Sequence, residues 1–197
     1  MSLVMAFIGQ QGAVMGGDTR EIITSGEIVT TETLENELYQ GGIITDEDLR
    51  QRAEDLGISL VIRDDKRKVA LRDGILVGEV CETANGITRK RRLYATAGEY
   101  ALAEISGDII RLTGRGKGGN FVVLGSPVAR QIAHSCIREK GKICTLRDAI
   151  KIIILSMERS SKASATVSGT YELIQTPEKV SLSGIIERDR KDCRQES

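Results

Sequence analysis

The sequence predicts a layered α+β fold, and two observations support this. Strand-like and helix-like segments occur in runs: two strands, two helices, a long series of strands, two more helices and two closing strands. Consecutive helices between runs of strands favour packed layers over a parallel sheet with alternating helices. The chain also contains 21 Gly but only two Pro, which indicates many tight turns between short elements.

An apolar hairpin opens the chain. Leu3–Ile8 is a continuous apolar run, residues 9–12 read Gly-Gln-Gln-Gly, and residues 13–15 resume the run before a Gly-Gly-Asp break. A short apolar run bounded by glycines is typical of a strand buried on both faces. We therefore expect this hairpin at the centre of the core.

An acidic helical segment follows the hairpin. Residues 31–38 predict a short helix that ends at Gly41, and Thr45 with Asp48 has the pattern of a capping box for a second helix that ends near residue 56. Eight acidic and two basic residues lie between positions 32 and 56, which gives a local charge of −6. A solvated helical face explains such a charge run.

The remaining segments are strands with two helices among them. Ser126 and Pro127 begin one helix as cap and first residue, and Thr145 with Asp148 begins a long apolar one. A charged tail over residues 187–197 follows a single domain over residues 1–186. Strands are predicted over residues 59–62, 69–71, 75–80, 92–97, 109–112, 121–124, 167–174 and 180–185.

Composition excludes several classes of function. The 28 basic residues balance 28 acidic ones, and aromatic residues make up 3% of the chain, so neither a general electrostatic grip on nucleic acid nor a base-stacking platform is expected. No segment has the features of a signal peptide or a membrane span. Four scattered Cys and a single His do not suit a zinc site. We expect a cytoplasmic protein without metal or cofactor.

Three polar features have simple structural explanations. The glycine-rich residues 114–119 lack the Gly-Lys-Ser/Thr ending of a phosphate loop and lead into a strand, so we interpret them as a flexible turn. The basic residues 89–92 suit an exposed strand edge, with contact to an acidic peptide as the alternative. His134 lies in a largely apolar helix without an evident Ser or Asp relay, so we interpret it as structural.

The N-terminus offers a nucleophile. Ser2 follows the initiator Met, and so small a residue normally permits removal of that Met. The mature chain would begin with a hydroxyl and an α-amine on one residue. An unperturbed α-amine has a pKa of roughly 7.7–8.0, so part of the population is neutral at physiological pH and can serve as the base.

Residues 2–7 and 12–20 resemble, without a gap, the start of proteasome β-subunits, in which an N-terminal threonine opens a strand and the second strand ends in Ala-Ala-Asp-Thr-Arg. The resemblance implies a four-layer αββα fold of the N-terminal-nucleophile (Ntn) hydrolases. It places Ser2 on the threonine nucleophile and Asp18 on the acid that organises its charge network. Arg20 matches the arginine just beyond.

Two later motifs extend this resemblance. Residues 94–98, Tyr-Ala-Thr-Ala-Gly, are similar to the strand end whose glycine N–H forms the oxyanion hole, which implies that role for Gly98. Residues 125–127, Gly-Ser-Pro, resemble the opening of the third helix of that fold, which implies a position for Ser126 near the active terminus.

The chain also departs from the proteasome pattern. Proteasome subunits carry a lysine shortly after the second strand, which lowers the pKa of the N-terminal amine, whereas this chain has no lysine before Lys66. Its acidic helical segment has no counterpart in proteasome subunits. An Asp-Ser-x-Ser-Gly motif is blurred into residues 159–164 without the acid. Candidates for the missing cation are Lys66, Lys68, Lys90 and Lys162.

With these departures, residues 1–9 and 90–98 resemble connectase, a family of proteasome-related protein ligases from methanogenic archaea. The resemblance implies cleavage of a substrate at a Lys-Asp-Pro-Gly-Ala motif. The upstream fragment is held on the enzyme's N-terminus as an amide and is then transferred to a chain that begins Pro-Gly-Ala. The implied natural substrate is a subunit of the membrane methyltransferase of methanogenesis.

We therefore expect a monomeric transpeptidase that acts on a protein substrate, with no nucleic-acid partner and no membrane embedding. Ser2, Asp18, Gly98 and Ser126 are the expected catalytic residues, and Arg20, Arg91 and Arg92 are expected to bind substrate. One alternative is an Ntn hydrolase that transfers the acyl group to water. The other is a peptide-binding module that has kept the fold and lost the chemistry.

Overall fold

A four-stranded antiparallel sheet holds the start of the chain at its centre. The computed structural model describes residues 3–84, 87–141 and 145–195. Every residue of the first two strands is buried, with alternate side chains on opposite faces of the sheet, because both faces are covered. The buried hairpin is confirmed. The strands, in spatial order, are β10 (Asn120–Gly125), β1 (Leu3–Ile8), β2 (Ala13–Asp18) and β11 (Tyr171–Thr176).

A five-stranded meander packs on one face of this first sheet. Leu76, Val80 and Leu93 from the meander meet Val4, Ala6 and Met15 from the hairpin. The sheets approach closely at Gly78, where an added Cβ would lie 2.6 Å from the Met15 sulfur. The strands follow one another in space as in the chain: β5 (Val69–Arg72), β6 (Ile75–Ala84), β7 (Ile87–Thr96), β8 (Glu99–Ser106) and β9 (Ile109–Lys117).

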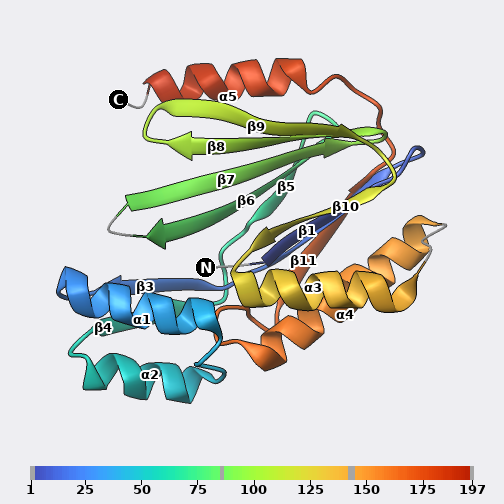
Figure 1. The fold of residues 1–197 in the computed structure, drawn as a ribbon. Helices are drawn as coiled ribbons and strands as arrows, with labels where there is room; N and C mark the ends of the chain where they lie inside the picture. Colours follow the sequence, from blue (N-terminus) through green and yellow to red (C-terminus); the bar gives the residue numbers. More distant parts are fainter. Residues whose placement is uncertain (1–2, 85–86, 142–144, 196–197) are drawn as a thin grey trace.

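Helices cover the outer faces of both sheets (Figure 1). α3 (Pro127–Lys140) and α4 (Leu146–Ala163) pack on the first sheet through Leu3, Met5 and Phe7 of β1. α5 (Ser183–Gln195) packs on the five-stranded sheet. Strands and helices therefore alternate in runs and stack in layers, and the predicted α+β class is confirmed.

The acidic segment forms a small subdomain at one end of the sheets. A two-stranded sheet, β3 (Glu21–Ser25) with β4 (Ser59–Arg63), brackets α1 (Ile28–Gln40) and α2 (Asp46–Asp55). Both helices were predicted, and their ends have the predicted signals. Gly41 ends α1 in the left-handed conformation with φ of 77°, and Thr45 caps α2 in a capping box with Asp48.

The end of the chain differs from the prediction. Residues 180–185 were predicted as a strand, but α5 begins at Ser183 and continues through residues 187–195, which were predicted as a charged tail. Leu182, Ile185 and Ile186 recur at helical spacing and cover the five-stranded sheet, so burial of that face selects the helix. The domain boundary at residue 186 stays a prediction.

Three further details correct the sequence interpretation. The strands β3 and β8 were not predicted. Residues 114–117 belong to β9, so the glycine-rich segment is a turn only at its end. The basic residues 89–92 lie on β7, which has β6 on one side and β8 on the other, so they do not lie on a sheet edge.

Candidate functional site

The end of β1 that begins at Leu3 lies beside a fully buried carboxylate. The Leu3 N–H donates to Asp18 Oδ1 over 2.6 Å, and the Arg20 N–H donates to Asp18 Oδ2 over 2.9 Å. Because β1 and β2 form an antiparallel hairpin, the last residue of β2 lies next to the first residue of β1. A buried carboxylate is costly unless charges or hydrogen bonds compensate it, and Asp18 has both.

Lys68 supplies the compensating charge. Its Nζ donates to Asp18 Oδ2 over 2.8 Å, and its side chain is only 6% exposed. It comes from the loop that leads into β5, fifty residues after Asp18. Burial lowers the pKa of Lys68, and the negative charge of Asp18 opposes that shift.

The other candidate lysines lie elsewhere. Lys66 pairs with Glu21 over 3.1 Å at the surface, and its side chain is about half exposed. Lys90 is exposed, 4.0 Å from Glu79. Lys162 is exposed near the end of α4. Of the four candidate lysines, Lys68 is therefore the one that the structure places at Asp18.

Ser126 lies at the same end of the first sheet. β10 pairs with β1 so that Gly125 is opposite Leu3, and Ser126 comes directly after this pair. Its buried hydroxyl accepts a hydrogen bond from the Ala129 N–H over 3.3 Å and caps α3, as predicted. The pairing of the strands thus brings Asp18 and Ser126 to the start of β1, where Lys68 reaches Asp18 from the loop before β5.

Arg20 fastens the acidic subdomain to this site. Its guanidinium pairs with Asp64, at 2.8 Å for both hydrogen bonds, and with Asp46 at the start of α2. It also donates to the Ala165 carbonyl over 2.9 Å. The hydrogen bonds that Arg20 donates to the Asp64 carboxylate raise the pKa of Arg20 further above its ordinary value. The guanidinium is buried and already pairs with two carboxylates, so a substrate could bind it only if one of these ion pairs were broken.

A hydroxyl-rich segment after α4 contacts Thr19, the residue after Asp18, and the sequence interpretation missed it. Ser168 Oγ accepts a hydrogen bond from the Thr19 N–H over 3.0 Å, and Ser164 Oγ is 2.8 Å from Thr166 Oγ1. All three of these 164–168 side chains are buried. The sequence search stopped at residues 159–164. The Ser-Gly pair at 168–169 is the signal that would have extended it.

Gly98 is not at this site. It lies in the turn between β7 and β8 with φ of 89°, and its N–H donates to the Gly9 carbonyl over 2.9 Å. Gly9 follows the far end of β1, about 20 Å of extended strand from Leu3. A role of the Gly98 N–H in binding an oxyanion beside Ser2 does not fit this placement.

The two arginines of β7 point to opposite faces. Arg92 pairs with Glu79 and with Asp189 of α5, which also accepts the Tyr94 hydroxyl over 2.7 Å. This buried network holds α5 on the sheet, so Arg92 is not open to substrate. Arg91 lies half-buried at the register position opposite Val80, and its role in substrate binding stays a prediction.

Ser2 lies outside the described residues, so its role also stays a prediction. Within residues 3–84, 87–141 and 145–195, no group of three or more His, Cys, Asp or Glu side chains is arranged to hold a metal ion. In the same residues, no helix has both the length and the apolar character to cross a membrane. His134 is exposed on α3.

The fold and the site define an α+β protein with two stacked sheets and a buried Lys–Asp pair at the start of its first strand. The sequence model described as "Connectase MJ0548-like, N-terminal domain" matches residues 1–191. The chain therefore belongs to the connectase family, as its sequence indicated.

Two solved structures of Anbu resemble the chain at 10% sequence identity. Anbu (ancestral beta-subunit) from Yersinia bercovieri has a TM-score of 0.40 over 98% of this chain and 94% of that one. An Anbu mutant from Hyphomicrobium sp. strain MC1 has the same TM-score over 100% of this chain and 94% of that one. At this TM-score the likeness does not assign a fold. No curated protein matched the chain.

Proposed function

We propose that this protein is an N-terminal-nucleophile transpeptidase, a protein ligase that works through Ser2 after removal of Met1. In this proposal its layers correspond to the αββα sandwich of the Ntn hydrolases. The observation that carries the proposal is the buried Lys68–Asp18 pair beside the Leu3 N–H. That N–H belongs to the peptide bond that joins residue 3 to Ser2.

The electrostatics at Asp18 support this role. A cation in a nearly dry site favours the neutral form of a neighbouring amine, because two positive charges repel strongly where water is excluded. Lys68 can therefore keep the α-amine of Ser2 unprotonated, as a base requires. Asp18 orients both the Lys68 ammonium and the first backbone amide of β1.

The reaction balances without cofactor or water. Ser2 Oγ attacks the carbonyl of the motif's aspartate, the α-amine accepts the hydroxyl proton, and that proton passes to the leaving Pro nitrogen. The resulting ester shifts from oxygen to the adjacent amine and becomes an amide. The steps reverse with an incoming Pro-Gly-Ala amine. One peptide bond is broken and one is formed, so the exchange is near thermoneutral.

Ser126 is the side chain we assign to the oxyanion. Its hydroxyl lies at the first turn of α3, where backbone N–H groups and the helix dipole also favour negative charge. One such donor contributes about 2.7–4 kcal/mol to a transition state.

The family resemblance supplies the rest of the proposal. The substrate is a protein with a Lys-Asp-Pro-Gly-Ala-type motif, a subunit of the methyltransferase of methanogenesis. The enzyme acts as a cytoplasmic monomer in a methanogenic archaeon. These points rest on the resemblance and on no contact within the chain.

Intact-mass spectrometry with a motif peptide tests the nucleophile. We expect wild type to lose Met1 and to gain the mass of the upstream fragment. Ser2→Ala should give no adduct while it still binds the peptide. An undiminished adduct on Ser2→Ala would remove the assignment.

Product analysis separates the alternatives. With a competing Pro-Gly-Ala peptide present, a ligase yields the recombined peptide, a hydrolase yields the free acid, and a binding module yields neither. The position of Gly98, far from the start of β1, favours neither the hydrolase nor the binding module. The buried pair at Asp18 favours an active site over a binding module. A buried ion pair is often no more stabilising than apolar residues in its place, so its presence here suggests a function other than stability.

A further inference from the structure

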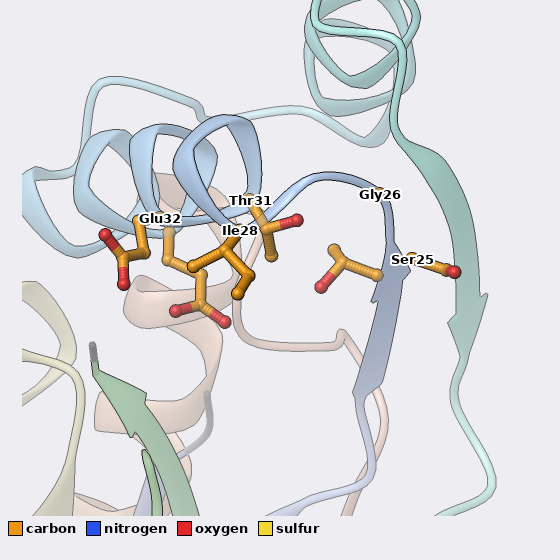
Figure 2. Close-up of a pocket in the computed structure, with 7 residues that line it drawn as sticks. Ser25, Gly26, Ile28, Thr31 and Glu32 are labelled. Carbon is orange, nitrogen blue, oxygen red and sulfur yellow. The ribbon is translucent and has the colours of Figure 1, made fainter. Parts of the chain in front are cut away.

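Cavities at the two ends of the molecule differ in the charge of their linings. One of about 280 Å³ lies at the start of α1, where Glu32 projects from the helix beside Ile28 and Thr31 (Figure 2). Two others, of about 440 Å³ each, lie at the opposite end, where the turn between β7 and β8 approaches the chain that leads into α5 (Figure 1). These two adjoin and form one basic cleft, which is defined by Glu99, Arg115, Lys117, Lys179, Ser181 and Ser183.

Three cations converge on the basic cleft. Arg115 and Lys117 alternate with glycines on β9, so both side chains lie on the same face of that strand. Lys179 lies between β11 and α5. All three are exposed, and none of them forms an ion pair in the part of the chain that the structure describes. By contrast, Arg188 of the neighbouring α5 pairs with Asp73 over 2.6 Å.

Glu99 is the one carboxylate among the described lining residues, and it leaves the cleft positive. It lies opposite Lys117 in the register of β8 and β9, yet its Oε1 accepts the Leu182 N–H over 3.4 Å and forms no ion pair with that lysine. The lining therefore has a net charge of +2 in a chain whose overall charge is zero. A cavity lined by an excess of one sign of charge concentrates ligands of the other sign.

Neutral donors add to these charges at the start of α5. The cleft contains the hydroxyls of Ser181 and Ser183, and the Ser183 N–H donates to Ser181 Oγ over 3.4 Å. No acidic residue lies in the first turn of α5, where the helix dipole favours negative charge. A guanidinium fork, lysine ammonium groups and hydroxyls are the donors with which proteins hold phosphate.

We propose that the basic cleft binds a small molecule that carries two phosphate groups. Lys117 lines both cavities, whereas Arg115 lines one and Lys179 the other. One phosphate group therefore lies between Arg115 and Lys117, and the second lies between Lys117 and Lys179. The volume of each cavity is typical of sites for small molecules.

This binding site is separate from the site at Asp18. Gln10 lines the basic cleft and follows the far end of β1, about 20 Å of extended strand from Leu3. Binding of the phosphate ligand therefore does not depend on the reaction proposed for Ser2, and it can be measured without turnover.

Isothermal titration calorimetry of the full chain with pyrophosphate, in the presence of a metal chelator, tests the cleft. Orthophosphate and succinate are the comparison ligands, because the first has one phosphate group and the second has two carboxylates. Three variants each remove one cation from an exposed position: Arg115→Met, Lys117→Met and Lys179→Met. Lys151→Met is the matched control, because Lys151 is exposed on α4 and lines neither cavity.

We expect one pyrophosphate per chain, bound about tenfold more tightly than orthophosphate or succinate. Lys117→Met should weaken pyrophosphate binding about tenfold, and more than Arg115→Met or Lys179→Met, because Lys117 contacts both phosphate groups. Lys151→Met should leave the affinity within about twofold. Glu99→Gln should strengthen binding about twofold, since it removes the repelling charge and keeps an oxygen for the Leu182 N–H.

Amide NMR shifts of the same titration locate the ligand, and they should change in residues 97–99, 115–118 and 179–184. Changes confined to other residues, no saturable binding of pyrophosphate, or an equal loss of affinity in Lys151→Met would each overturn the proposal. Tighter binding of succinate or of a glutamate-rich peptide than of pyrophosphate would also overturn it, because the cleft would then select carboxylates over phosphate.

Discussion

Lys68 Nζ lies 2.8 Å from Asp18 Oδ2, and both side chains are almost completely buried although fifty residues separate them in the chain. The opening hairpin fixes the position of Asp18, whereas Lys68 lies in a loop that follows the acidic subdomain in the sequence. The Lys68 backbone carbonyl accepts the Glu79 N–H over 2.9 Å, so the five-stranded sheet holds the loop in place. The site thus depends on the packing of both sheets.

Removal of Lys68 should affect stability and activity together. Lys68→Met leaves the Asp18 carboxylate buried without its cation, and loss of one partner of a buried pair costs about 3–5 kcal/mol. Urea unfolding should show a loss near the lower limit, because Asp18 keeps two backbone hydrogen bonds. Adduct formation at Ser2 should fall about a hundredfold or more.

Two controls separate these effects. Lys66→Met removes a surface pair with Glu21 and should change stability by less than about 1 kcal/mol. The double variant Asp18→Asn, Lys68→Met removes both buried charges, so it should recover part of the stability but none of the activity. Full activity in the double variant would show that the pair has no catalytic part.

Loss of Arg20 should loosen the acidic subdomain more than the rest of the chain. Arg20→Met breaks the ion pairs to Asp46 and Asp64, and these pairs join α2 and the loop after β4 to the end of β2. We expect a loss of about 2–3 kcal/mol, since charge-assisted hydrogen bonds of a buried guanidinium are strong while both carboxylates can regain water.

Hydrogen exchange locates that effect. Amide exchange should accelerate in α1, α2, β3 and β4 and change little in β1 and α4. Arg63→Met is the matched control, because Arg63 is exposed on β4. A uniform rise of amide exchange across both sheets would contradict a local role of Arg20 in holding the acidic subdomain on the rest of the chain.

Much of the local structure could be predicted because its causes are local. The buried hairpin, the capping box at Thr45 and the cap at Ser126 each depend on a few neighbouring residues, and the structure has all three. α5 was missed because its apolar residues follow Val180 closely and imitate a strand. Burial of these apolar residues against the five-stranded sheet favours the helix over the strand.

The site could be predicted only in part, for a related reason. Asp18 follows from the hairpin, but the choice of Lys68 among four lysines depends on how the loop before β5 packs. Gly98 fits a short motif, yet the pairing of its N–H with Gly9 places it at the opposite end of β1. Short motifs carry no information on such long-range pairing.

Close contact between the sheets should make Gly78 intolerant of any side chain. In Gly78→Ala the new Cβ would meet Met15 Sδ at 2.6 Å and Val4 Cγ1 at 2.7 Å. Overpacking of this kind costs about 1–3 kcal/mol. Gly169→Ala, with no atom within 4 Å of the added Cβ, is the control and should be close to neutral. Equal unfolding midpoints for the two variants would contradict the close approach.

The pH dependence of stability should reveal the unfavourable charge of Glu35. Burial raises its pKa above the ordinary value of 4.5, so the folded protein holds the proton more tightly than the unfolded chain. The resulting stabilisation is complete below pH 4.5 and is lost as the pH rises through the folded-state pKa. Glu35→Gln should therefore gain stability relative to wild type as the pH rises from 4 to 7.

The gain at pH 7 should stay below about 1 kcal/mol, because Glu35 is partly solvated. Urea unfolding of wild type, Glu35→Gln and the exposed control Glu54→Gln at several pH values measures it. A lower stability of Glu35→Gln than of wild type at pH 7 would contradict the unfavourable burial of this carboxylate.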